Sequence, residues 1–449
     1  MATFLVVGGV YIDELHTVAG YPIEDSTVRS LAVERRRGGN AGNTSVVLRQ
    51  LVSSASRINW MGVLPAPGGD DEGVKFVLDD LHENGVETLL RELISPPAGS
   101  SVRLGVPTAM IIVSEATGSR TIISNRRGLV NEVSPAWFAS KIPALLETSA
   151  AGWIHLETRN YESVIQLARE AHDKVHKSST LAPFGTAGTR WRISIEVEKP
   201  GITVEEAVEL ASFADLVFLS RDWAEARASQ LLGDLDSRGL HTRPLKRGDN
   251  LGEHLATPVL CEVATRAWAH NRSGPVAAVC AWGAQGAFAI TTEHGPIRPS
   301  EENSYEVHFA LAKVADKVVD STGAGDTFNA AVIAALGSGV SVNEALKCGC
   351  AVAGQKVQQD GFQGLAKALQ PSRSAGAAPS LPANASANAS ASASSEGADG
   401  ADGAEGKRTE GAAPASTSPS AAGASGVARH PNGARKRQRA SGAATKERG

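Results

Sequence analysis

The chain has 449 residues, of which 42% are hydrophobic, 20% charged and 5% aromatic, and its formal net charge is −4. This length accommodates two or three ordinary domains or one large one, and the nearly balanced charge excludes a strongly basic nucleic-acid-binding protein. The four cysteines lack paired CxxC spacing, which excludes a disulfide scaffold and favours a reducing compartment. Because the chain shows no secretory leader and no long apolar run, we expect a cytoplasmic protein without a membrane segment.

The predicted elements of residues 1–370 alternate between strands and helices. An apolar strand at Thr3–Val10 is followed by helical patterns at Asn40–Leu51 and Asp71–Asn84. Further short apolar runs then alternate with helical segments; they lie at 105–123, 153–156, 193–197, 216–219 and 276–281. This alternation is typical of an α/β domain in which helices cover both faces of a mostly parallel sheet. Residues 227–274 are charged and weakly patterned, and we expect them to form a surface insertion.

The composition changes abruptly near Gln370. Residues 371–449 are mainly Ala, Ser, Gly, Pro and Asn, and they contain no Phe, Trp, Tyr, Ile or Met. Such a segment cannot bury enough apolar surface to offset the conformational entropy of the chain, so we expect a disordered low-complexity tail. The basic run Arg435–Arg439 is a candidate nuclear import signal, although short basic runs in such tails are more often only solvated.

The strongest chemical motif is the glycine turn Gly323-Ala324-Gly325-Asp326, where a short apolar lead meets a clearly helical run. Backbone N–H groups at the start of that helix, together with its dipole, would form an anion hole suited to a phosphoryl group. A carboxylate at Asp326 could take a proton from an attacking hydroxyl. The same residues also suit a tight turn with an acidic helix cap, so the motif alone leaves both interpretations open.

Two further motifs indicate a polar ligand. Arg37–Asn43 combines the adjacent glycines Gly38 and Gly39, which let a ligand approach the backbone, with two Asn amides that could bind neighbouring hydroxyls. A turn and an N-cap also explain it. Asp13 follows the first strand, at the edge where ligands of α/β sheets bind, but Asp is also a common turn residue. The chain has no P-loop, no GxGxxG after its first strand and no HExxH, so those three classes of site are excluded.

In this order and spacing, the three motifs resemble the signatures of the ribokinase-like (PfkB-type) carbohydrate kinases. Several stretches are similar to the ketohexokinase branch, the animal-type fructokinases; they include Tyr21–Ser26, Glu115–Ile122, Trp153–Asn160, Ser194–Pro200 and Cys280–Gly283. The resemblance spans about residues 4–366 and omits the tail and most of 227–274. It implies a three-layer α/β/α domain with a small β-sheet lid, whose strands would lie at about 10–36 and 105–125.

The resemblance implies that the chain transfers a phosphoryl group from ATP to a sugar hydroxyl. Asp326 would be the base, beside an anion hole formed by Gly323, Ala324 and Gly325. The sugar would also contact five other residues, namely Asp13, Gly39, Asn40, Asn43 and Glu157. Arg120 would reach the phosphates. The rest of the nucleotide site would be lined by Gly283, Ala284, Gln285, Gly286 and Ala353.

The resemblance also implies Mg²⁺ bridging the phosphates, with K⁺ as a candidate further ion, and a homodimer in which two lids clasp each other. Many family members organise Mg²⁺ through an Asn-x-x-Glu motif, but the corresponding stretch here is Ser220–Trp223, which leaves Glu196 and Glu198 as candidates. The match at Glu157–Asn160, beside the expected pocket, favours a ketohexose such as fructose, with fructose 1-phosphate as product. The alternatives are a kinase for ribose, a nucleoside or another sugar, and a non-catalytic sensor or scaffold.

Overall fold

The structure is a computed structural model that describes residues 2–129, 132–176, 184, 190–237, 251–271, 276–292, 305–313, 315 and 317–370. The predicted disordered tail and the basic run lie outside the described residues. Within them, no helix has the length and apolar character needed to cross a membrane.

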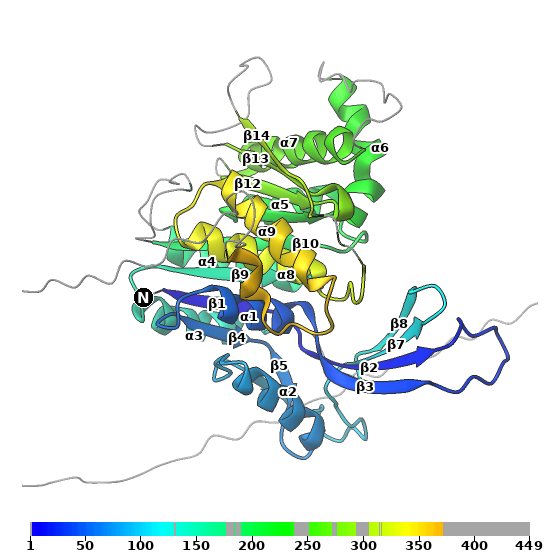
Figure 1. Cartoon of the computed structure of the whole chain (residues 1–449). Helices are drawn as coiled ribbons and strands as arrows, with labels where there is room; N and C mark the ends of the chain where they lie inside the picture. Colours follow the sequence, from blue (N-terminus) through cyan, green and yellow to red (C-terminus); the bar gives the residue numbers. More distant parts are fainter. Residues whose placement is uncertain are drawn as a thin grey trace, which may run out of the picture. The chain divides into compact units, whose positions relative to one another are not determined.

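An eight-stranded sheet forms the centre of the molecule, in the order β14-β13-β12-β11-β10-β9-β1-β4 (Figure 1). Its strands are β1 (Thr3–Val7), β4 (Arg57–Met61), β9 (Gly152–Glu157), β10 (Trp191–Val197), β11 (Leu216–Ser220), β12 (Ala277–Ala281), β13 (Ala287–Thr291) and β14 (Glu306–Ala310). Every pair from β4 to β12 is parallel, whereas β13 and β14 add two antiparallel strands at one edge. The fold is therefore α/β with a mostly parallel sheet, as the sequence predicts.

Helices cover both faces of this sheet, which explains why its inner strands are apolar along most of their length. One apolar core joins the sheet to α3 (Pro135–Glu147), α4 (Tyr161–Val175), α5 (Val204–Ala211), α6 (Arg221–Ser237) and α7 (Leu251–Asn271). The other core joins it to α1 (Asn40–Leu51), α2 (Asp71–Glu83), α8 (Ala324–Gly337) and α9 (Val342–Lys356). Two short 3-10 helices, η1 (Gly283–Gln285) and η2 (Leu365–Leu369), complete the helical elements described.

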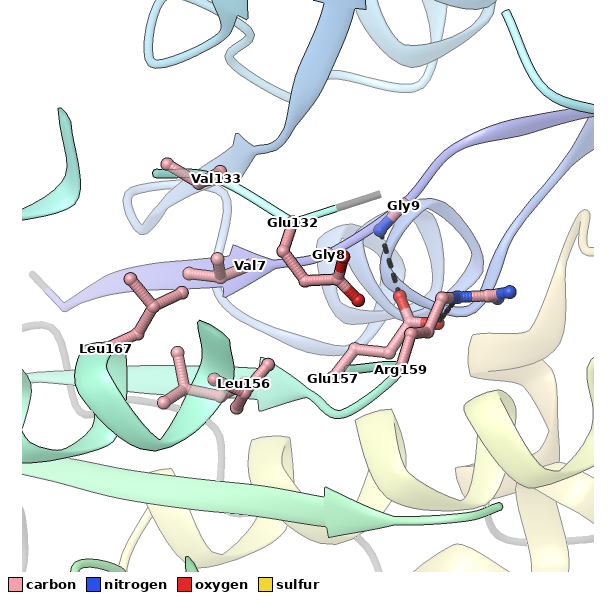
Figure 2. Close-up of a pocket in the computed structure, with 10 residues that line it drawn as sticks. Val7, Gly8, Gly9, Glu132, Val133, Leu156, Glu157, Arg159 and Leu167 are labelled. Carbon is pink, nitrogen blue, oxygen red and sulfur yellow. Dashed lines mark hydrogen bonds and ion pairs between the residues drawn. The ribbon is translucent and has the colours of Figure 1, made fainter. Parts of the chain in front are cut away.

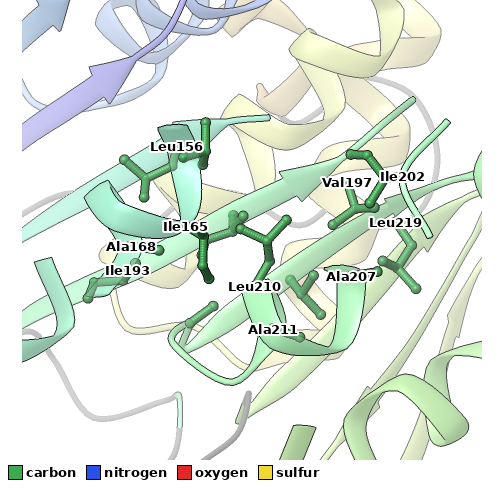
Figure 3. Close-up of a cluster of buried hydrophobic side chains, with 14 of the residues drawn as sticks. Leu156, Ile165, Ala168, Ile193, Val197, Ile202, Ala207, Leu210, Ala211 and Leu219 are labelled. Carbon is green, nitrogen blue, oxygen red and sulfur yellow. The ribbon is translucent and has the colours of Figure 1, made fainter. Parts of the chain in front are cut away.

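Helix α4 illustrates how the local sequence produces this packing. The Asn160 side chain caps the helix by accepting a hydrogen bond from the Ser163 N–H group at 3.0 Å. Val164, Ala168 and Ala171 are buried at helical spacing, so they form one apolar face. Figure 3 shows α4 and α5 side chains packed over strands β9, β10 and β11.

A second, four-stranded sheet forms a lid beside the main sheet, in the order β3-β2-β7-β8 (Figure 1). Its strands are β2 (Tyr11–Val18), β3 (Ala32–Gly38), β7 (Thr108–Ser114) and β8 (Arg120–Asn125). The predicted ranges for lid strands, about 10–36 and 105–125, overlap all four, and β3 runs two residues beyond the first range. A separate two-stranded sheet pairs β5 (Val63–Pro65) with β6 (Glu92–Ile94).

Helix α7 corrects the prediction that residues 227–274 form a surface insertion. Val259, Leu260 and Val263 are fully buried, and the helix belongs to the same apolar core as β12 and β13. Much of its buried face is alanine, which gives little hydrophobic contrast, and the buried Glu262 interrupts the apolar pattern. The sequence pattern therefore does not indicate that this helix belongs to the core. Residues 238–250 and 272–275 lie outside the described residues.

Candidate functional site

A cavity of about 910 Å³ lies at the carboxyl ends of the central parallel strands. Its walls come from the lid strands, from the residues that follow β10, β11 and β12, and from the first turns of α1 and α8. This position is where α/β sheets usually bind ligands, and the volume falls within the range of small-molecule and cofactor sites.

The cavity brings together most of the predicted site residues, although they are far apart in sequence. Those that line it are Asp13, Gly39, Asn40, Asn43, Arg120, Glu196, Glu198, Gly283, Ala284, Gly286, Gly323, Ala324, Gly325, Asp326 and Ala353. Two predicted residues are not part of the lining. Gln285 lies on η1 between lining residues, and Glu157 lies behind the cavity wall.

The glycine pair before α1 places two Asn side chains in the first turn of that helix. Gly39 has a φ of 90°, and a Cβ atom there would lie 2.5 Å from the carbonyl oxygen of Gly9, so no other residue fits. Both amides are already engaged within the protein. Asn40 donates to Glu198 Oε2 at 3.0 Å and accepts from Arg159 at 3.3 Å. The predicted pair of free hydroxyl-binding amides is thus, in this structure, a pair of bridges between side chains.

Asn43 links a buried arginine to Asp326. Its amide nitrogen donates to Asp326 Oδ2 at 2.7 Å, and its amide oxygen accepts from Arg37 Nη1 at 2.7 Å. Arg37 is buried and also pairs with Asp80 on α2. This chain of contacts fixes the orientation of the Asp326 carboxylate toward the cavity.

Two aspartates that line the cavity, Asp13 and Asp326, are buried, and burial changes how readily they ionise. Burial raises the pKa of Asp326 to about 7; the hydrogen bond from Asn43 opposes this shift, and the carboxylate of Glu198 adds to it. Burial also raises the pKa of Asp13 to about 6, against the opposing charges of Arg36 and Arg37. Asp326 is thus poised to exchange a proton near neutral pH.

Asp326 stands in the first turn of α8, next to the helix N-terminus. Gly323 adopts a left-handed φ of 74° and caps the helix, and Thr327 N–H closes the first turn onto the Gly323 carbonyl at 2.9 Å. The first N–H groups of a helix lack partners within it, and the helix dipole adds positive potential there. A Cβ atom at Gly325 would meet open space, so the cavity approaches the backbone closely at this point. The turn can therefore receive an anion.

Glu157 lies behind the cavity wall and contacts the backbone there. The sequence analysis instead places it beside the sugar. The Oε2 atom of Glu157 accepts from the Gly9 N–H group at 3.0 Å, and the Oε1 atom pairs with Arg159 (Figure 2). The Oε2 atom also accepts from the Ala41 N–H group at 3.2 Å. With both oxygens occupied and the residue buried, it ties the end of β1 to the start of α1.

Arg159 is one of the lining residues that the sequence analysis did not single out. Its guanidinium donates to the Tyr11 hydroxyl at 3.1 Å, lies 4.7 Å from the centre of the Tyr11 ring and is also held by Glu157. The signal was available, because Arg159 stands inside the matching stretch Glu157–Asn160. Side-chain identity alone does not say which member of the stretch faces the cavity.

Glu196 and Glu198 provide carboxylate oxygens at the cavity wall. Glu196 accepts from Asn329 Nδ2 at 3.0 Å, and burial, aided by the charge of Glu198, raises its pKa well above the usual range. The described residues contain no group of three His, Cys, Asp or Glu placed to hold a metal ion. One or two carboxylates still suit Mg²⁺, which usually takes its remaining ligands from water and substrate phosphates. Both glutamates therefore fit as partners of a phosphate-bound Mg²⁺, whose positive charge would favour the ionised form of Glu196.

Comparisons with known proteins agree with this geometry. The sequence profile of the pfkB family carbohydrate kinases matches residues 262–368. The chain is 32% identical to ketohexokinase from Mus musculus over 361 residues, which is 80% of this chain and 98% of the mouse protein. Ribokinase from Giardia lamblia shares the fold, with a TM-score of 0.56 and 14% identity over 81% of this chain and 95% of that one.

A second solved structure, the Cryptococcus neoformans ribokinase in complex with ADP, has a TM-score of 0.53 and 18% identity over 82% of this chain and 98% of that one. At these identities the two structures support the fold, and the mouse relative supports the family. The chain therefore belongs to the pfkB, or ribokinase-like, family of carbohydrate kinases, enzymes that transfer a phosphoryl group from ATP to a sugar.

Proposed function

We propose that this kinase phosphorylates a neutral ketohexose such as fructose, giving fructose 1-phosphate. The observation that carries the proposal is the position of Asp326, a buried carboxylate with a pKa near 7, directly beside the helix N-terminus that can receive the phosphoryl group. The near-complete coverage of a ketohexokinase at 32% identity favours a ketohexose over ribose or a nucleoside.

The charge of the cavity supports a neutral acceptor. The carboxyl groups of Asp13, Asp326, Glu196 and Glu198 gather at the end of the cavity beside α1, where they outnumber the lining cations Arg159 and Lys199. A sugar that already carries a phosphate or carboxylate would meet repulsion there. The other end is lined by cationic side chains, Arg120, Arg221 and Lys313, which suit the phosphates of ATP.

In the proposed reaction, Asp326 accepts the proton of the sugar hydroxyl while the hydroxyl oxygen bonds to the γ-phosphorus. The bond between that phosphorus and the bridging oxygen breaks, and ADP leaves with the electron pair. The N–H groups at the start of α8 stabilise the charge on the transferred group, and Arg120 neutralises phosphate charge. Mg²⁺, when bound with ATP, would neutralise further phosphate charge, and Glu196 and Glu198 are its proposed partners. The lid excludes water, which would otherwise accept the phosphoryl group.

A coupled ADP-release assay tests the proposal. We expect turnover with Mg-ATP and fructose, weaker turnover with ribose, other hexoses and adenosine, and none with fructose 6-phosphate. Asp326→Asn should reduce turnover by about 10²–10⁴-fold, the usual contribution of a general base. Preference for another neutral acceptor would keep the mechanism and overturn the ketohexose. Folded, ATP-binding protein that phosphorylates none of these acceptors would instead support the alternative of a non-catalytic sensor.

We also propose that two copies associate through their lids. On the lid face opposite the cavity, Met110 and Ile123 are cross-strand neighbours that are 44% and 56% exposed, and Val33 is 63% exposed. An exposed apolar patch on a sheet favours covering by a partner. Ile123→Asp should lower the mass measured by analytical ultracentrifugation from dimer to monomer. Leu89→Asp, at a 79% exposed position outside the lid, should leave the mass unchanged.

A further inference from the structure

Cationic side chains from two lid strands converge on one short segment of the main domain. The segment is Asp320–Thr322, directly before the Gly323 cap of α8. Arg36 of β3 donates to Asp320 Oδ2 at 3.1 Å. Arg120 of β8 donates to Ser321 Oγ at 2.5 Å and to Thr322 Oγ1 at 3.2 Å. The lid therefore rests on the segment that leads into the anion hole.

Asp320 is the centre of these contacts. Its Oδ1 atom accepts from the Thr322 N–H group at 2.8 Å, which shapes the segment itself. Its Oδ2 atom accepts from Arg36 and, at 2.8 Å, from Lys356 Nζ at the end of α9. Lys356 also donates to the Asp320 carbonyl at 3.0 Å. One carboxylate thus joins the lid, the segment and a helix of the main domain.

The burial of these groups makes the contacts sensitive to geometry. Lys356 has no exposed side-chain surface, and the side chains of Arg36 and Asp320 are only 13% and 14% exposed. Solvent and salt screen such charges weakly, so losing one partner has a large effect on the others. Phe362 lies beside Lys356 and also blocks any side chain at Gly323, so the same packing reaches the helix cap.

We propose that Arg36 and Asp320 are positioning residues that couple the lid to the anion hole, so that the N–H groups of α8 are correctly placed only while the lid contacts Asp320. Neither side chain lines the cavity. The inference rests on the proposed phosphoryl transfer, because it assigns these residues a role in that reaction. A second lid contact of Arg36, to Asp360 at 2.9 Å, involves a 62% exposed carboxylate and is screened more strongly.

The neighbouring residue on the same strand provides a matched control. Arg35 also links the lid to the main domain, through Glu72 of α2 at 3.3 Å, but its side chain is 38% exposed and that of Glu72 is 87% exposed. This pair does not touch residues 320–322. Removing Arg35 therefore removes a charge and a lid contact of similar kind without disturbing the proposed coupling.

The test compares Arg36→Met, Asp320→Asn, the double variant and Arg35→Met. We expect Arg36→Met to lower kcat by about 10- to 100-fold, as small displacements of catalytic groups do, with a smaller change in the KM for sugar. The ratio of ADP to sugar phosphate formed should rise, because a loosened lid admits water. Arg35→Met should remain within about twofold of wild type. The double variant should be no slower than the slower single variant, because both changes remove the same contact.

Hydrogen exchange of the unliganded protein separates this inference from the proposed function. In Arg36→Met, but not in Arg35→Met, amides of residues 320–326 should exchange faster. Equal exchange and equal kcat in the two arginine variants, or independent and additive effects of Arg36 and Asp320, would overturn the coupling. An inactive wild type whose residues 320–326 still respond to Arg36→Met would overturn the proposed function alone. Recovery of kcat in Arg36→Lys would support a role for the positive charge.

Discussion

Asp326 faces two opposing demands at the scale of a single residue. To accept a proton it must be ionised, yet the burial that shields the reaction from water disfavours its charge. The contact with Asn43, itself held by Arg37, partly compensates by stabilising the carboxylate. The outcome is a proposed base whose charge changes near neutral pH.

The pH dependence of turnover follows from this balance. Because the base must be ionised in the free enzyme, we expect kcat/KM to fall as the pH drops below about 7, the pKa of Asp326. Asn43→Ala should move this midpoint upward by about 0.5 to 1 unit, since it removes a hydrogen bond to the charged form. Stopped-time assays between pH 5 and about pH 9 would measure it. A midpoint that stays in place or moves to lower pH would contradict the assignment.

The ionised Asp326 also lowers the free energy of unfolding. The folded-state pKa of Asp326, about 7, lies above its ordinary value of 3.8, so ionising it destabilises the fold as the pH rises between these values. We therefore expect Asp326→Asn to increase the free energy of unfolding by about 1 to 4 kcal/mol at alkaline pH. The gain should disappear in acid, where Asp326 is neutral. Urea unfolding at about pH 8 and about pH 4 measures both, and a gain independent of pH would refute the explanation.

Single residues also show which features of the site can be predicted from the sequence and which cannot. The glycine turns and their polar neighbours identify Asp326 and Asn43 as candidates, because their local chemistry is visible in a few consecutive letters. Their mutual hydrogen bond joins residues that are 283 positions apart, and no local pattern reports such a pair. Glu157 shows the converse: its motif is recognisable, but whether it contacts ligand or backbone depends on which way the strand end turns.

At the scale of elements, the start of α8 separates two kinds of glycine. A Cβ atom at Gly323 would meet Phe362 at 2.4 Å, and its φ of 74° is unfavourable for other residues. A Cβ atom at Gly325 would meet nothing within 4 Å but would extend toward the cavity. The first glycine is needed for the turn, whereas the second leaves room for a ligand.

Two alanine substitutions distinguish these roles. Gly323→Ala should lower both turnover and the free energy of unfolding, the latter by about 1 to 3 kcal/mol. Gly325→Ala should leave stability nearly unchanged, since alanine favours helix, and should lower kcat by about 10²-fold or more by crowding the phosphoryl group. Thermal unfolding and initial rates check both variants. Equal losses of stability in the two would show that Gly325 is structural as well.

Helices and strands differ in how clearly their sequences predict them. Helix α1 begins and ends where the sequence predicts, because glycine marks its start, although its residues from Ala41 to Leu48 are all buried rather than buried on one face. Helix α7 is missed as a core helix, because alanines form much of its buried surface and Glu262 is buried among them. The antiparallel pair β13–β14 also has no clear signal, since strand direction depends on pairing rather than composition.

At the scale of the whole molecule, the last described element defines where the kinase domain needs to end. Leu365 is fully buried and Leu369 nearly so, and the Leu365 N–H group donates to Gln50 on α1 at 3.1 Å. Removing residues 371–449 should therefore keep turnover and melting temperature close to wild type. Removing residues 364–449 should destabilise the protein by several kcal/mol, about 2 to 5 for each buried leucine. A loss of turnover in the variant that lacks only residues 371–449 would give the tail a role in catalysis.

The tail itself offers a proposal about location that the described residues do not address. We propose that the protein is cytoplasmic, with Arg435–Arg439 as the candidate signal that would direct part of it to the nucleus. A fluorescent fusion in which these basic residues are changed to alanine should lose any nuclear signal seen with the unchanged fusion. An identical distribution of the two fusions would show that the run is a solvated part of the tail.

Strand β1 has a consequence for how the chain folds. It is formed by Thr3–Val7 and lies between β4 and β9, with which it pairs on either side. One of its edges therefore stays unpaired until Gly152–Glu157 has been made. Until synthesis has passed Glu157, this apolar strand remains half paired. Parallel pairs of such sequence separation form slowly, because loop closure costs entropy before the contacts compensate. An apolar edge of β1 is thus exposed in the growing chain until β9 has been made, which makes that edge a site where the unfinished chain could pair wrongly.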